Sequence, residues 1–192
     1  MISHPDDSLD FLGTALGRGL ATGLGPAELS LEAGVTIAQL PTGTIVRIHG
    51  AYGPGMGWKH PIALWVKRLH EALKKIKGVS LALPPPPVPE HLAFCFVDDA
   101  VDAVAIAARG RPGTIYEASS HSPAQDELVR AIGRLMGVKA KLTPGTPVPA
   151  PNVPDTAALH ALGWSPRFML DQGLKRTVPW LLDRLQEARR AA

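Results

Sequence analysis

The stretch of sequence that decides the fold is TIVRIHGAYGPGM, over residues 44–56. Its first part, from Thr44 to His49, is rich in β-branched residues and predicts a buried strand. Its second part, from Gly50 to Gly55, combines glycines with a proline and predicts a turn. His49 is therefore expected at the end of a strand. It is the best acid–base candidate of the chain, and the alternative is a histidine packed for structure alone.

Outward from this stretch, strands and helices alternate. On its N-terminal side, the residues from Ala27 to Gln39 predict a helix. On its C-terminal side, the predicted strands cover residues 79–83, 93–97 and 114–118. The predicted helices cover residues 61–77, 98–108, 123–136, 156–162 and 170–192, with side-chain caps expected from Asp98, Asp99, Ser122 and Asp155. This alternation predicts an α/β fold with a partly parallel sheet.

Composition bounds the classes of protein that the chain can belong to. With 192 residues, 45% hydrophobic and 19% charged, it is long and apolar enough for one domain with a real core. Its single cysteine, Cys95, excludes an internal disulfide framework and a cysteine-cluster metal site. We interpret Cys95 as a buried core thiol, because it lies within an apolar strand. The histidines lack the spacing of metal ligands, so no metal site is predicted.

The charge and hydropathy of the chain also argue against two kinds of partner, nucleic acids and membranes. The formal net charge is only +3, and no aromatic residues alternate with the basic ones, so no nucleic-acid partner is expected. We interpret the basic clusters over 67–77 and 184–190 as solvated helix faces. No run of about 18 apolar residues predicts a membrane span. The N-terminus lacks the order of a signal peptide, so a cytoplasmic protein is expected.

A glycine motif near the N-terminus is the first candidate for a cofactor site. Residues Gly13 to Gly19 have a Gly-x-x-x-Gly-x-Gly spacing like that of a dinucleotide-binding turn. No clear buried strand precedes it. Only 27 residues separate Gly19 from Arg47, too few for several βα units of about 30 residues each. A helix or loop of small residues is the preferred interpretation.

The stretch from Arg47 to Met56 resembles the Arg-x-x-Asn-Val-Tyr-Gly-Pro-Gly-Met segment of the NAD-dependent epimerase/dehydratase family, the extended short-chain dehydrogenases/reductases. Further segments resemble other motifs of that family, in the family's order, over roughly residues 27–182. These segments are Phe94–Val101, Ile115–Ser119, Glu127–Gly137, Asp155–Ala157, Leu162–Pro166 and Gly173–Trp180.

The resemblance covers the family's C-terminal half only. It implies an α/β fold made of the last strands of a doubly wound, Rossmann-like sheet together with the small substrate-binding lobe. Residues 27–192 would form this half-domain, and residues 1–26 are a poorly assigned N-terminal segment. The family's cofactor glycine turn and early strands have no match. The segment 27–39 matches one of the helices that pair subunits in the family.

Candidate site residues follow from the resemblance. It implies NAD or NADP as the cofactor, although binding by this chain alone is doubtful without the glycine turn. It also implies a small-molecule substrate, a sugar or another carbonyl or hydroxyl compound. The family's substrate Asn falls on Gly50, and its diphosphate-binding Arg falls on His91 or Leu92, which weakens the case for a nucleotide-sugar. By resemblance the cofactor-binding residues are His49 and Gly50, and the substrate-binding residues are Tyr52, Gly53, Pro54 and His91.

The family's catalytic motif is Tyr-x-x-x-Lys, and the chain lacks it. Four residues after Tyr52 is Met56, and four residues after Tyr116 is Ser120. His49 is then the remaining catalytic candidate. We expect an N-terminally shortened family protein that is weak or inactive alone. The alternative is a non-catalytic binding module, with a homodimer or a protein partner covering an exposed sheet edge. A third alternative is a misplaced start codon.

Overall fold

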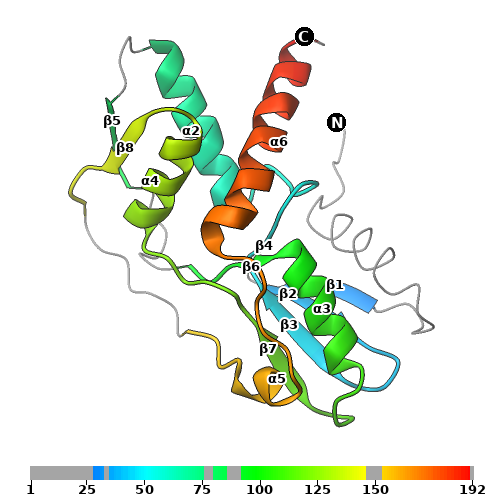
Figure 1. The fold of residues 1–192 in the computed structure, drawn as a ribbon. Helices are drawn as coiled ribbons and strands as arrows, with labels where there is room; N and C mark the ends of the chain where they lie inside the picture. The colour runs from blue at the N-terminus through cyan, green and yellow to red at the C-terminus, as the bar shows by residue number, and fades with distance from the viewer. Residues whose placement is uncertain (1–27, 33–34, 76–79, 86–91, 146–152, 191–192) are drawn as a thin grey trace.

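The computed structural model describes residues 28–32, 35–75, 80–85, 92–145 and 153–190, with side-chain environments from Thr36 onward. It is a mixed α/β structure with helices stacked beside three small sheets (Figure 1). The strands are β1 (Glu28–Glu32), β2 (Val35–Gln39), β3 (Ile45–His49), β4 (Ala51–Tyr52), β5 (Ser80–Leu83), β6 (Cys95–Phe96), β7 (Ile115–Ala118) and β8 (Lys139–Leu142). The helices are α2 (Pro61–Lys75), α3 (Val97–Ala107), α4 (Gln125–Leu135), α5 (Ala157–Ala161) and α6 (Leu170–Arg190).

The largest sheet has four strands in the order β1-β2-β3-β7. Strands β1, β2 and β3 are antiparallel neighbours, whereas β3 and β7 are parallel. In the parallel pair Arg47 lies opposite Glu117, and Ile48 lies opposite Ala118. The expected partly parallel α/β sheet is therefore confirmed, and its parallel part is the β3–β7 pair.

The helix expected from Ala27 to Gln39 is wrong. The described residues of this segment form the strands β1 and β2, which run antiparallel to each other. The consecutive β-branched residues of β2, Val35 to Ile37, favour a strand over a helix. A tight turn then returns the chain into β3, with Gly43 at a φ of 79° and its N–H donating to the carbonyl of Leu40. The dimer helix that the resemblance implied here is therefore absent from the described residues.

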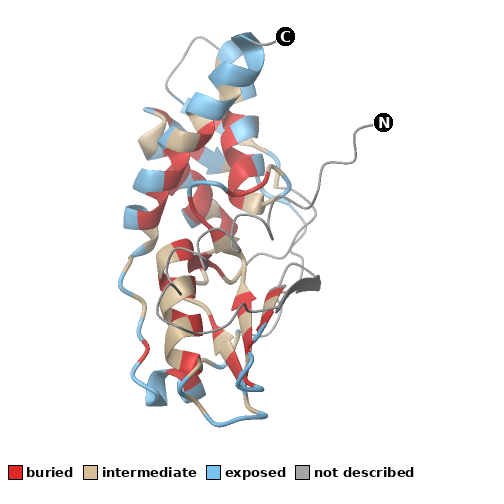
Figure 2. Ribbon diagram, turned by 90° about the vertical axis from the view of Figure 1, so that its right-hand side faces the viewer, coloured by how far each residue is buried: buried red, intermediate tan, exposed pale blue. Residues whose placement is uncertain are grey.

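The four-stranded sheet has two different faces. Val46, Ile48 and Ala118 are buried in the core, and α3 packs against β3 and β7. Side chains alternate along a strand, so Arg47 and Glu117 project to the opposite face, where they are only half-buried. Figure 2 shows this alternation of buried and part-buried positions along the strands. The sheet thus has an apolar face and a polar face.

Three helices, α2, α4 and α6, form a second group beside the pair β5–β8, whereas α5 packs against β7. The helices α2, α4 and α6 contact one another, and α4 also packs against β8 (Figure 1). The amphipathic pattern predicted for the segment 61–77 is confirmed, because Ile62, Trp65, Val66 and Leu69 are buried in α2. Strand β8 was not predicted. Its sequence, KAKL, has no β-branched residue, and its pairing with β5 makes it a strand.

The helix starts differ from the predicted caps. Helix α3 begins at Val97, so Asp98 and Asp99 lie inside its first turn, and no side chain caps it. Helix α4 begins at Gln125, after Ala124, so it starts two residues later than the predicted first residue, Pro123. Among the helices of the described ranges, none has the length and apolar character that a membrane span requires.

Candidate functional site

The carboxyl ends of β3 and β7 bring together three polar side chains from two distant parts of the sequence. The Nε2 atom of His49 lies 2.5 Å from Oε2 of Glu117. The guanidinium of Arg47 lies 3.4 Å from the other oxygen, Oε1, of the same carboxylate. Strand alternation places Arg47 and His49 on one face, and the parallel register sets Glu117 directly opposite Arg47. Ligands of open α/β sheets bind at this carboxyl edge.

These three side chains are neither buried nor fully exposed. The side chains of His49 and Glu117 are 20% and 23% exposed, and that of Arg47 is 43% exposed. An imidazole next to a carboxylate can accept or donate a hydrogen bond at its second nitrogen. The arrangement can therefore bind a hydroxyl group or hold a proton. His49, the predicted acid–base candidate, is accessible.

Gly50, which follows β3, allows a backbone conformation and a close backbone contact that a larger residue would prevent. Its φ is +47°, which favours glycine, and a Cβ at this position would lie 2.3 Å from the carbonyl oxygen of Ala93. This close approach sets β4 beside β6, with Ala51 opposite Cys95. Protein atoms therefore occupy the space next to Gly50. Cofactor contact by His49 and Gly50 stays a prediction.

The ring of Tyr52 lies inside the core. It is 0% exposed and packs edge-on against Phe94 and Phe96, with ring centroids 6.1 and 5.4 Å away. Burial raises the pKa of its phenol, and within the described residues its hydroxyl has no hydrogen-bond partner. Of the other predicted substrate contacts, Gly53 is buried, Pro54 is exposed and His91 lies outside the described residues. Substrate contact by these four residues stays a prediction.

The second tyrosine, Tyr116, is also buried. It is 4% exposed, and its hydroxyl accepts a hydrogen bond from the backbone N–H of Arg111 over 3.1 Å. Gly110 packs so closely that a Cβ there would lie 2.5 Å from the same hydroxyl. Both tyrosines of the chain thus have buried phenols, in addition to lacking a lysine four residues later.

Cys95 is a core thiol, as predicted. It is fully buried in β6, and burial raises its pKa to about 12. The hydroxyl of Ser120 lies 3.5 Å from its sulfur and 3.2 Å from Oδ2 of Asp99. A protonated, buried thiol is a poor nucleophile. We therefore assign Cys95 no chemical role.

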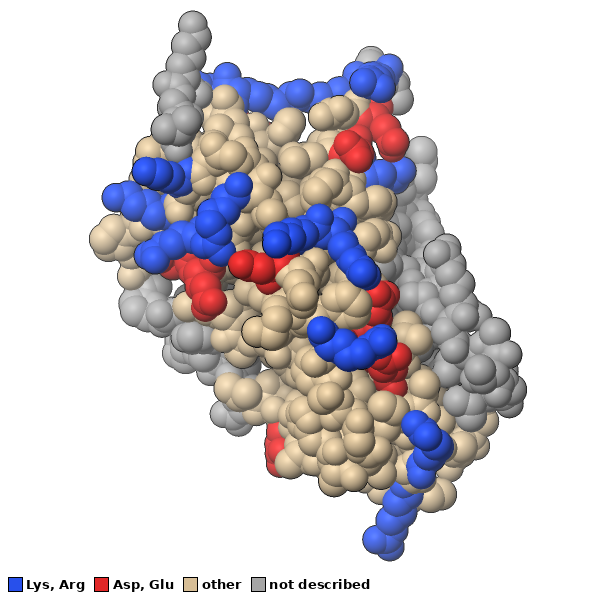
Figure 3. All heavy atoms as spheres, in the orientation of Figure 1, with Lys and Arg blue, Asp and Glu red and all other residues tan. Residues whose placement is uncertain are grey.

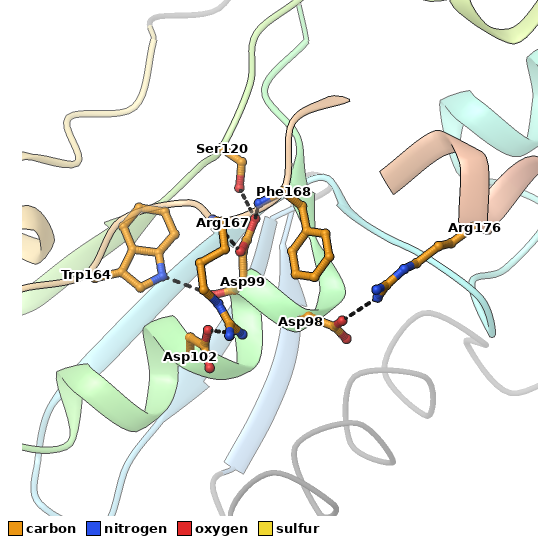
Figure 4. Close-up of polar contacts among 8 residues, drawn as sticks. All are labelled: Asp98, Asp99, Asp102, Ser120, Trp164, Arg167, Phe168 and Arg176. Atoms are coloured by element: carbon orange, nitrogen blue, oxygen red, sulfur yellow. Dashed lines mark hydrogen bonds and ion pairs between the residues drawn. The ribbon is translucent and has the colours of Figure 1, made fainter. Parts of the chain in front are cut away.

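Asp99 is a buried carboxylate that joins three segments of the chain (Figure 4). It accepts hydrogen bonds from the backbone N–H of Arg167 over 2.9 Å and from that of Phe168 over 3.4 Å. Its backbone carbonyl accepts a hydrogen bond from Nε1 of the buried Trp164 over 3.0 Å. The predicted cap role of Asp99 is wrong. It anchors the segment after α5 to the first turn of α3.

Two further aspartates of α3 form ion pairs with this same segment and with α6. Asp98 pairs with Arg176 over 2.9 Å, and Asp102 pairs with Arg167 (Figure 4). The guanidinium of Arg176 also lies 4.6 Å from the ring centroid of Phe168. Burial raises the pKa of Asp102, although Arg167 opposes that shift. Both ion pairs join elements of the same chain to each other, so we interpret Asp98 and Asp102 as structural.

Among the residues that the structure describes, other basic groups lie at the ends of two helices. Lys74 and Lys75 end α2, Arg189 and Arg190 end α6, and Figure 3 shows these ends as a basic edge. All four are exposed, in agreement with the predicted solvated faces. Across the described ranges, no three His, Cys, Asp or Glu side chains are placed to hold a metal ion.

No protein-family model and no curated protein sequence matches the chain. Solved structures do match. RMD from Pseudomonas aeruginosa, complexed with NADPH, has a TM-score of 0.60 at 21% identity over 73% of this chain and 48% of its own. The chain shares its fold with part of the NAD-dependent epimerase/dehydratase enzymes.

Two further structures have this epimerase/dehydratase fold. The dTDP-glucose 4,6-dehydratase from Bacillus anthracis, in complex with NAD, has a TM-score of 0.55 at 21% identity over 74% of this chain and 45% of its own. The UDP-glucose 4-epimerase from Thermus thermophilus, in complex with NAD, has a TM-score of 0.53 at 23% identity over 71% and 45%. The chain matches less than half the length of each of these enzymes.

Sequence reasoning found His49 but missed its partner. Glu117 is 68 residues away along the chain, and only the parallel pairing of β3 with β7 brings it to the imidazole. One signal could have found it. Both predicted strands end in small or polar residues, and parallel neighbours end at the same edge of a sheet.

Proposed function

We propose that the chain is an NAD-dependent epimerase/dehydratase-like protein whose polar site is the carboxyl edge of β3 and β7. The observation that carries the proposal is the agreement between the ordered family motifs of the sequence and the shared fold. The motif segment Arg47–Met56 provides β3, the glycine-rich turn and β4, as a binding edge requires. The ligand class that we propose is a sugar or another hydroxyl or carbonyl compound, bound next to His49, and UDP-glucose is the probe for it.

The described residues alone do not form a dinucleotide cradle. On the side where Gly50, the cofactor-side glycine by resemblance, would carry a Cβ, the carbonyl oxygen of Ala93 and the ring of Phe94 fill the space. NAD(P) would supply hydride exchange when bound, and His49 would lie on its nicotinamide side. We propose that this chain by itself has little or no epimerase or dehydratase activity.

Calorimetry on the purified chain tests the proposal. NADH, NADPH and UDP-glucose are titrated separately, first into the unchanged chain and then into a His49→Ala variant. Binding of UDP-glucose that weakens in His49→Ala supports a ligand site at the β3–β7 edge. Tight binding of NADH or NADPH would overturn the claim that the cofactor side is incomplete. Binding of none of the three would overturn the proposed function.

A non-catalytic binding module is the second candidate. The burial of both phenols favours it, because no described tyrosine can exchange a proton with a ligand. The two functions differ in turnover. A binding module holds UDP-glucose without converting it, even when NAD and the first half of an epimerase are supplied. An enzyme subunit produces UDP-galactose under those conditions. A coupled assay for UDP-galactose distinguishes them.

A further inference from the structure

We propose that Glu117 fixes the imidazole of His49 so that Nδ1 is the hydrogen-bond and proton acceptor for a hydroxyl group of the ligand. This pair would take the place of the buried phenols. The proposal deepens the proposed function, on which it rests for the class of ligand. The pair itself is a property of the protein without ligand and can be tested separately.

The orientation of the ring follows from the chemistry of a carboxylate. An ionised carboxylate only accepts hydrogen bonds, so the 2.5 Å contact requires that Nε2 of His49 carries a proton. In a neutral imidazole the other nitrogen, Nδ1, then has no proton and acts as an acceptor. Glu117 is thus a positioning residue. It sets which nitrogen faces a ligand.

Arg47 fixes the carboxylate in turn. Its guanidinium lies 3.4 Å from Oε1, so both oxygens of Glu117 have a partner. The three residues occupy neighbouring positions on paired strands, which hold them more firmly than a loop would. A carboxylate that orients a histidine through one nitrogen, and leaves the other for the reacting group, is a recurrent arrangement in acid–base chemistry.

The location of Nδ1 suits a ligand. The imidazole is part-exposed at the carboxyl edge of the parallel pair, where ligands of such sheets bind. The imidazole contacts Glu117 through Nε2, which leaves Nδ1 as the nitrogen that can meet a ligand. Both tyrosines have buried phenols, and the thiol of Cys95 is buried. His49 is therefore the described acid–base group best placed to meet a hydroxyl.

Imidazole NMR on the ¹⁵N-labelled full chain tests the pair without any ligand. We expect a slowly exchanging proton on Nε2 of His49, assigned by its loss in His49→Gln, and an unprotonated Nδ1. Glu117→Ala should abolish the slow exchange, whereas Glu127→Ala, on the exposed face of α4, should leave it unchanged. A proton on Nδ1, or slow exchange that persists in Glu117→Ala, would overturn the proposal.

Titration with UDP-glucose then tests whether Nδ1 of His49 accepts a hydrogen bond from the ligand. His49→Gln retains an amide that can reach Glu117 but lacks Nδ1. We expect it to bind UDP-glucose about tenfold more weakly, the change for one lost hydrogen bond of about 1.4 kcal/mol. Glu117→Ala should weaken binding similarly, and Glu127→Ala should not. Binding that stays within about twofold in His49→Gln would overturn the proposal. If the unchanged chain does not bind UDP-glucose, the proposed function fails. The NMR spectrum still tests whether Glu117 fixes the imidazole of His49.

Discussion

The carboxylate of Asp99 accepts a hydrogen bond from the backbone N–H of Arg167, 68 residues further along the chain, over 2.9 Å. This bond joins the start of α3 to the segment that leads into α6. It matters for the candidate site because α3 packs against the buried face of β3, whose other face carries His49. The buried carboxylate therefore supports the strand that positions the imidazole.

We expect Asp99→Ala to lower the free energy of unfolding by about 3 kcal/mol. It leaves the N–H groups of Arg167 and Phe168 without their acceptor, and each unsatisfied buried donor costs about 1–3 kcal/mol. The control is Asp98→Ala, which breaks an exposed ion pair with Arg176 and should cost less than about 1 kcal/mol. Urea unfolding measures both. Equal losses in the two variants would contradict the anchoring role.

Gly173 allows α6 to approach the core, and we expect Gly173→Ala to destabilise the protein. A Cβ at this position would lie 2.3 Å from the hydroxyl oxygen of Tyr52. Overpacking costs about 1–3 kcal/mol, which exceeds the gain of about 1 kcal/mol in helix propensity. Adding Tyr52→Phe removes that oxygen and should restore part of the stability. Lys175→Ala, on the exposed side of α6, is the control in thermal unfolding.

His60 should make the stability depend on pH. Burial lowers its pKa to about 4, below the value of about 6.5 expected in the unfolded chain. Below about pH 6.5 the unfolded chain takes up a proton that the folded protein does not, so stability falls as the pH decreases toward 4. His60→Asn should remove the contribution of His60 to the change of the free energy of unfolding with pH. Asparagine can still cap α2, where Nδ1 of His60 now accepts the N–H of Ile62 over 3.2 Å.

The pH dependence is measured by urea unfolding of both proteins at several pH values between about 4.5 and 7. His70 is the internal comparison, since its pKa is also lowered by burial, and it stays in both proteins. A slope that is the same in His60→Asn as in the unchanged chain would show that other groups carry the effect.

Cys95 should react with thiol reagents only when the protein opens. Its pKa of about 12 and its position in the core leave almost no accessible thiolate at neutral pH. We expect labelling in the folded state to be at least about 100-fold slower than labelling of the urea-unfolded chain. Since the sequence has one cysteine, the signal is unambiguous. Rapid labelling under native conditions would contradict the described packing.

The parts of the fold that could be predicted from the sequence are those where local pattern and packing agree. The strand before Gly50 and the amphipathic helix from Pro61 are both visible as periodic apolar residues. Strand β8 was missed because its sequence has no strand preference and depends on β5. Asp99 was misread for a related reason, because the segment that it anchors, from Trp164 to Phe168, lies more than sixty residues away.

In the candidate site, too, some features can be predicted from local sequence and others depend on the fold. The position of His49 at a strand end, with Arg47 two residues earlier on the same face, follows from local sequence. Glu117 becomes their neighbour only through the register of β3 with β7. The wrong helix over residues 27–39 followed from the local sequence, and the family resemblance agreed with it. The β-branched run from Val35 to Ile37 gave the better indication.

The hairpin of β1 and β2 has a consequence for attempts to complement this chain with a second polypeptide. Strand β3 already has hydrogen-bonded neighbours on both sides, β2 on one and β7 on the other. A parallel strand supplied in trans can therefore join β3 only by displacing one of them, and on the side away from β7 that neighbour is β2. Reconstitution of a larger enzyme from separate fragments would then require strand exchange, and its rate would be limited by release of the hairpin rather than by the concentration of the added fragment.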